Sequence, residues 1–114
     1  MIVLKDDNIE YIKYGILDQA NTDFITAKRQ LYKLDNGYYD NVKKPPCRDT
    51  VQRQLDEVID FFYSDWFTYL YPKVDPQFVI DKLDARVDEW IVKCEKESNA
   101  RYAYGVMKRK LYKI

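Results

Sequence analysis

Apolar residues recur every three or four positions along most of the chain, a spacing typical of amphipathic helices. The first such stretch covers residues 9–34, and its apolar side chains share an arc wide enough to face a core. Asp7 or Asn8 can cap its start, and Asn36 or Gly37 can supply the left-handed residue that ends it. The pattern predicts one long helix here.

A loop and a second helix follow. Adjacent prolines at 45–46 exclude a helix at that point, because proline has no amide proton to donate. Asp49 and Gln52 resemble a capping box, and the helical spacing then continues until Pro72 ends it. Ser64, with the aspartate after it, could cap a fresh turn, so we expect the second helix to bend there.

The last third of the chain predicts two more helices. Asp75 is suited to cap a helix whose first residue is Pro76, and residues 79–94 carry a third apolar stripe. A further cap at Ser98 and Asn99 would start a shorter helix toward the C-terminus. The expected fold is therefore all-α, a bundle of three long helices plus a shorter C-terminal helix, with residues 1–114 forming one domain.

Composition narrows the function classes. The 19 basic residues balance the 19 acidic ones, which argues against a uniformly basic nucleic-acid binder. Cys47 and Cys94 lack metal-type spacing, and two cysteines in a chain of this length favour free thiols in a reducing cytosol. The start of the chain has neither the basic region nor the apolar run of a signal peptide, and no later stretch is long and apolar enough to span a membrane. We expect a cytoplasmic protein with no membrane contact.

The chain contains no histidine, which removes the commonest general base and the commonest neutral metal ligand. Its three glycines do not form a phosphate-binding loop. These features predict a protein that is not an enzyme and has no catalytic residue, cofactor or metal site. An enzyme that relies only on carboxylates or tyrosines stays formally open.

Aromatic residues are concentrated between positions 61 and 71, where seven of eleven residues are aromatic. On one continuous helix, Phe62, Trp66 and Tyr69 would continue the core stripe, whereas other aromatics of the segment would project elsewhere. Either the bundle encloses this helix, or its extra faces bind another protein, since tyrosine and tryptophan are enriched in binding hot spots. The first helix offers a second stripe that could take part. The predicted partner-binding residues are Tyr14, Tyr32, Phe61, Tyr63, Phe67 and Tyr71.

The C-terminal stretch is locally basic, with five cations and no acidic residue from position 101 onward. With tyrosines between them, these cations could hold a phosphate backbone while the rings stack on bases. The alternative explanation is that cations at the C-terminus of a helix are favoured by the helix dipole. The residues of this alternative nucleic-acid site are Arg101, Lys108, Arg109, Lys110 and Lys113.

The sequence also resembles small uncharacterised helical proteins encoded by phages and prophages of low-GC Gram-positive bacteria. The resemblance spans residues 16–83, and its matching residues are 16–20, 23–24 and 27, then 58–67 and 70, and finally 74–76, 80 and 83. It assigns no functional residue. What it implies is a mobile-element protein in the cytoplasm of a bacterial host, acting by protein–protein binding, most concretely as an anti-CRISPR-like inhibitor of a host defence nuclease. Independently, the two apolar stripes of the first helix favour a homodimer.

Overall fold

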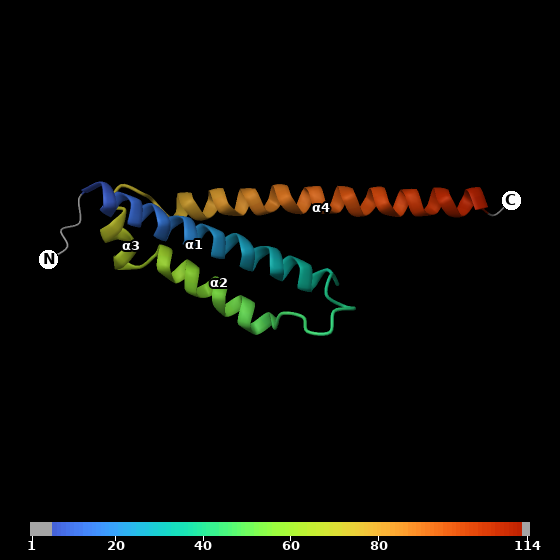
Figure 1. Cartoon of the computed structure of the whole chain (residues 1–114), viewed down its shortest axis with the longest axis horizontal. Coiled ribbons are helices and arrows are strands. Elements are labelled where there is room, and N and C mark those ends of the chain that lie inside the picture. Colours follow the sequence, from blue (N-terminus) through green and yellow to red (C-terminus); the bar gives the residue numbers. More distant parts are fainter. Residues whose placement is uncertain (1–5, 113–114) are drawn as a thin grey trace.

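The fold is all-α, as the spacing predicts. The computed structural model describes the backbone of residues 6–112 and the side chains of residues 9–99. Four helices make up the regular secondary structure of this part of the chain (Figure 1). They are α1 (Asp6–Asp35), α2 (Arg48–Phe62), α3 (Asp65–Leu70) and α4 (Pro76–Tyr112).

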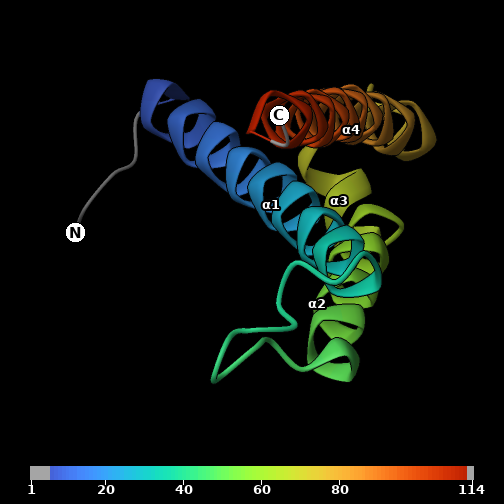
Figure 2. The same ribbon diagram turned by 90° about the vertical axis from the view of Figure 1, so that its right-hand side faces the viewer.

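Helix α1 is the centre of the arrangement. It packs against α2 on one side and against α4 on another (Figures 1 and 2). The short α3 lies near its N-terminal half (Figure 1). The C-terminal part of α4 extends beyond the ends of α1 and α2 (Figure 1). The molecule is accordingly elongated, with extents of 78 × 29 × 25 Å. Its radius of gyration is 20.3 Å, compared with about 13 Å for a compact chain of this length.

The core lies where α1, α2, α3 and the first half of α4 meet. Phe24, Phe62 and Phe67 are its largest fully buried side chains. Their rings pack edge to face, with centroids 6.5 Å apart for Phe24 and Phe62 and 5.5 Å apart for Phe62 and Phe67. Such contacts contribute beyond the apolar area that they bury. Smaller apolar residues complete the core: Ala20, Ala27, Leu31, Val51, Leu55, Ile80, Leu83 and Val87.

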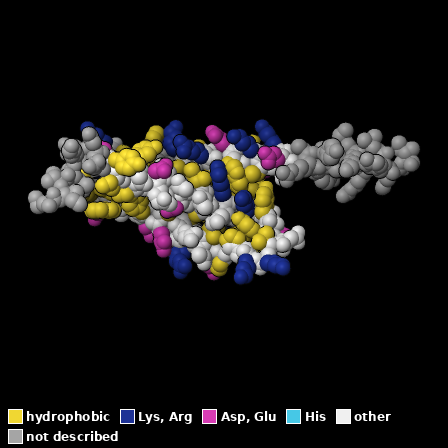
Figure 3. All heavy atoms as spheres, in the orientation of Figure 1, with side chains coloured by type: hydrophobic (Ala, Val, Ile, Leu, Met, Phe, Trp, Pro, Cys, Tyr) yellow, Lys and Arg dark blue, Asp and Glu magenta, His cyan; other side chains and the backbone are white. Residues whose placement is uncertain are grey.

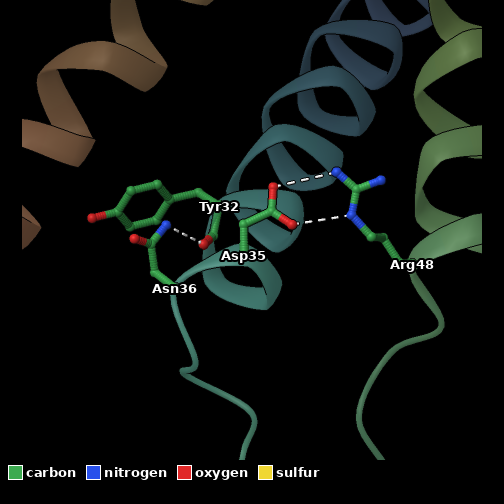
Figure 4. Close-up of polar contacts among 4 residues, drawn as sticks. All are labelled: Tyr32, Asp35, Asn36 and Arg48. Atoms are coloured by element: carbon green, nitrogen blue, oxygen red, sulfur yellow. Dashed lines mark hydrogen bonds and ion pairs between the residues drawn. The ribbon is translucent and has the colours of Figure 1, made fainter.

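The connection between α1 and α2 is closed by polar contacts (Figure 4). Gly37, with φ of 74°, takes the left-handed conformation that ends α1. Arg48 donates two hydrogen bonds to Asp35, Nε to Oδ1 at 3.0 Å and Nη2 to Oδ2 at 3.3 Å. These bonds lower the pKa of the Asp35 carboxyl. The end of α1 and the start of α2 are thus tied together across the loop.

One predicted helix start is confirmed, and another is displaced. Asp75 caps α4 by accepting a hydrogen bond from the backbone N–H of Gln77 at 3.0 Å, with Pro76 as the first helical residue. Helix α2 begins at Arg48, so the predicted capping box at Asp49 is not used. Instead Cys47 precedes the helix, and the nearby backbone and side chain of Thr50 lower the pKa of its thiol.

The prediction that a separate, shorter helix starts near Ser98 is wrong. Helix α4 runs without a break through Ser98 and Asn99, which are exposed positions where polar residues cost a helix only a few tenths of a kcal/mol. The short helix of the fold is α3. Helix α1 begins at Asp6, before the predicted start.

Candidate partner-binding surface

The aromatic segment is divided by a break between α2 and α3. Helix α2 ends at Phe62, and Ser64 has the extended backbone of an N-cap, with φ of −78° and ψ of 157°. The Ser64 hydroxyl accepts a hydrogen bond from the Phe67 N–H at 3.2 Å and donates one to the Phe61 carbonyl at 2.6 Å. The predicted fresh turn at Ser64 is therefore confirmed. A new helix starts there with its own rotational phase.

The break changes which aromatic side chains face the core. Phe67 is fully buried, and Phe61 and Tyr71 are half-buried and pack against the core. The Tyr71 hydroxyl donates a hydrogen bond to the Lys13 carbonyl, and burial raises the pKa of this tyrosine. The prediction that Phe67 projects toward a partner is wrong, because it continued the helical phase of α2 past Phe62, where a new helix begins. Phe61 lies before the break, within α2, and the half-buried Phe61 and Tyr71 keep only part of their surface for a partner.

The same error reverses the prediction for Trp66 and Tyr69. Both were expected in the core, yet Trp66 is 59% exposed and Tyr69 is 75% exposed. Their rings stack on each other, with centroids 5.8 Å apart and planes inclined by 12°. The outer face of α3 is therefore a flat, exposed pair of aromatic rings. The signal that could have revealed it was the Ser64 cap, which resets the helical spacing.

Two more exposed aromatic side chains lie where α2 ends and α4 begins. Tyr63 is 54% exposed, and its hydroxyl donates a hydrogen bond to the Gln77 side chain in the first turn of α4. Phe78, which follows Gln77 in the sequence, is 59% exposed, and the Lys82 ammonium lies 5.3 Å from the centre of its ring. Phe78 was missed in the sequence because it lies off the apolar stripe of α4.

We call these four residues, Tyr63, Trp66, Tyr69 and Phe78, the aromatic surface. In the space-filling view, hydrophobic side chains gather at the end of the molecule where α3, the start of α4 and the N-terminal half of α1 lie (Figure 3). Trp and Tyr combine large rigid area with a polar edge, which suits a surface that is hydrated when free and buried when bound. This end is the best candidate for partner binding.

The two predicted tyrosines of α1 have different surroundings. Tyr14 is 70% exposed, so it is available at the surface as predicted. Tyr32 is half-buried, with its ring 5.5 Å from that of Trp90 on α4 and 5.8 Å from that of Tyr38. Burial, followed by the proximity of Tyr38, raises the pKa of Tyr32. Tyr32 therefore joins α1 to α4, and the prediction that it faces a partner is not supported.

The predicted basic site lies outside the described side chains. The backbone of α4 is helical through Tyr112, which includes Arg101, Lys108, Arg109 and Lys110, whereas Lys113 lies beyond it. Within the described part of the chain, no three His, Cys, Asp or Glu residues are grouped so as to hold a metal ion. No helix in that part is long and apolar enough to cross a membrane.

Comparison with protein-family models, with curated proteins and with solved structures finds no match to this chain. Its function therefore has to be argued from the geometry and chemistry of its own surfaces.

Proposed function

We propose that this chain acts by binding another protein through the aromatic surface, without a catalytic step of its own. The observation that carries the proposal is the stacked pair of Trp66 and Tyr69, which exposes two large rings while the adjacent Phe67 supplies the core contact of the same helix. Tryptophan and tyrosine dominate binding hot spots because they bury much area with little loss of rotamer entropy.

Tyr63 and Phe78 would extend the contact onto the start of α4, and Tyr14 is a further exposed ring at the N-terminal half of α1. Polar groups accompany these rings, among them the Tyr63 hydroxyl bonded to Gln77 and the Lys82 ammonium over Phe78. An apolar centre with a polar rim is the usual composition of a protein–protein interface.

The most concrete form of the proposal follows from the resemblance to phage-encoded proteins: the partner is a host defence nuclease, such as a CRISPR effector, and the chain inhibits it by occupying its surface. The test is target-DNA cleavage by the purified nuclease of a low-GC Gram-positive host. We expect the chain to inhibit cleavage and Trp66→Ala/Tyr69→Ala to require at least about thirtyfold more protein for the same inhibition.

The matched control is Tyr38→Ala. Tyr38 is exposed and follows α1, at the opposite end of that helix from α3. Its removal should leave inhibition unchanged. Full inhibition by the double variant would refute the role of the aromatic surface. Absence of inhibition by the unaltered chain would refute the nuclease as the partner, and retention of proteins from a host lysate would then test whether another protein binds.

Nucleic-acid binding by the basic C-terminal residues is the second candidate. The observation in its favour is that α4 extends past the other helices and places a segment with four cations and no acidic residue at the end of the molecule. Binding of a labelled duplex should then weaken steeply with salt. It should also be lost in Lys108→Gln/Arg109→Gln/Lys110→Gln. Binding that is absent at low salt would exclude this function.

A further inference from the structure

A surface groove runs between α1 and α2 and shares no residue with the aromatic surface. It is lined by residues of α1 from Ile12 to Ala27 and by residues of α2 from Gln54 to Phe61, and its volume is about 760 Å³. Its floor is apolar, with Ile16 and Val58 among the lining residues. A groove between two helices with an apolar floor is the kind of site in which an amphipathic helix binds.

Charge and space at the groove restrict what can bind there. Two of the lining residues are acidic, Asp23 and Glu57, and none of them is basic. Both carboxylates are exposed. Gly15 also lines the groove, and a Cβ atom added there would meet nothing within 4 Å. The groove therefore suits a basic, partly apolar helix that approaches α1 closely.

The chain itself contains such a helix. Residues 100–112, which we call the α4 tail, are the last part of the helix that extends beyond α1 and α2 (Figure 1). The tail has four basic residues and no acidic one. The spacing of its apolar residues in the sequence predicts that they share one face of the helix, as a helix that binds in a groove requires. These residues are Ala100, Ala103, Tyr104, Met107 and Leu111.

Length agrees as well as charge. Thirteen helical residues span about 18 Å, and the α1 wall of the groove, from Ile12 to Ala27, spans about 22 Å. The tail cannot reach the groove of its own chain, because α4 is one continuous helix that leads away past the C-terminal end of α1. The groove lies along the N-terminal and middle part of α1. The tail that fits must come from another molecule.

We propose that two copies of this chain form a reciprocal dimer in which the α4 tail of each copy lies in the α1–α2 groove of the other. The interaction is isologous, so each dimer contains two identical contacts, as two-fold symmetry requires. This inference does not rest on the proposed function, because the groove and the aromatic surface share no residue.

Sedimentation equilibrium of the full chain, over a wide range of concentrations, tests the dimer. We expect a monomer–dimer equilibrium that weakens as salt rises, because opposite charges meet in the groove. Reversing the groove charges with Asp23→Lys/Glu57→Lys should weaken dimerisation at least about tenfold, and so should Lys108→Glu/Arg109→Glu/Lys110→Glu in the tail. Combining both sets in one chain should restore most of the affinity.

A third variant separates loss of binding from loss of folding. Gly15→Arg replaces a poor helix former by a good one at an open position, so circular dichroism and thermal unfolding should show a fold that is at least as stable. The added bulk and charge would nevertheless oppose a basic tail, and dimerisation should weaken at least about tenfold.

Asp88→Lys/Glu89→Lys is the matched control, because it makes the same charge change at exposed positions of α4 that do not line the groove. It should leave the dimer constant unchanged. A chain that stays monomeric at every concentration, a dimer that tolerates Gly15→Arg, or a combined groove and tail variant that fails to recover would each overturn the proposal.

Discussion

Phe67 and Trp66 are neighbours on α3, yet one is fully buried and the other is more than half exposed. Phe67 packs among Phe61, Phe62 and Tyr71, with ring centres 5.0 to 5.7 Å away. Trp66 stacks on Tyr69 at the surface. One helix thus presents two aromatic faces in different surroundings. The buried face holds α3 on α1 and α2, whereas the exposed face is the one that we propose binds a partner.

The largest expected effect is on the buried face. Phe67→Ala would leave a cavity among rings that cannot close around it, so we expect the free energy of unfolding to fall by about 3–5 kcal/mol. Trp66→Ala removes a larger side chain from an exposed position and should change it by no more than about 0.5 kcal/mol. Urea unfolding followed by circular dichroism measures both. Equal losses would break the distinction between the two faces.

The contrast depends on the break that Ser64 creates. Ser64→Ala removes the acceptor for the Phe67 N–H and the donor to the Phe61 carbonyl. Loss of an N-cap typically costs about 1 kcal/mol, and we expect that decrease in the free energy of unfolding. Thr68→Ala is the control, since the Thr68 hydroxyl only approaches the Ser64 carbonyl at 3.4 Å on the exposed side. If both substitutions have the same effect, the cap does not define α3.

Removing the hydroxyl group from Tyr71 or from Tyr69 tests the same difference between buried and exposed aromatic side chains. Tyr71→Phe loses the hydrogen bond to the Lys13 carbonyl and should reduce the free energy of unfolding by roughly 0.5–1.5 kcal/mol at neutral pH, whereas Tyr69→Phe should leave it unchanged.

The pH dependence gives a second readout on Tyr71. Burial raises its pKa, so its contribution is present below the ordinary tyrosine pKa of about 10 and is lost as pH rises through the raised value. Unfolding measured from pH 8 to 11 should show this loss, and Tyr71→Phe should make it smaller. An unchanged alkaline profile in the variant would contradict the buried role of Tyr71.

The smallest effect is expected far from both aromatic faces, at the ion pair of Asp35 and Arg48. Arg48 lowers the pKa of Asp35, so the pair stabilises the fold above the ordinary carboxyl pKa of about 3.9. The contribution is lost as pH falls through the lowered value. Both side chains are exposed, so Asp35→Asn should lower the melting temperature less than the other destabilising substitutions do. The decrease should appear only at pH values higher than the range in which the carboxyl group titrates. A shift as large as that of Phe67→Ala would contradict this order.

The sequence predicts the helices better than it predicts their faces. The spacing of apolar residues located α1, α2 and the start of α4, because helical periodicity is a local property. The orientation of the aromatic residues after Phe62 depends on Ser64, because its cap starts a new helix with a different helical phase. The continuity of α4 through Ser98 and Asn99 was missed because caps are preferences and not rules.

For the candidate site too, the sequence predicts which segment matters better than it predicts which side chains are exposed. Tyr14 and Tyr63 were named and are exposed, while Phe61, Phe67, Tyr71 and Tyr32 were named and pack inside or between helices. Residue type indicates that a segment is rich in aromatic area. Which part of that area faces solvent depends on how separate helices dock, and this is a property of the tertiary structure.

The central claim is that the exposed aromatic face binds a protein. Its most direct test is retention of proteins from the lysate of a low-GC Gram-positive bacterium on the immobilised chain, quantified by mass spectrometry. The unaltered chain and Tyr38→Ala are predicted to retain the same partner, and Trp66→Ala/Tyr69→Ala is predicted to lose it while keeping its thermal stability. Retention of that partner by the double variant, or no specific partner on the unaltered chain, would contradict the claim.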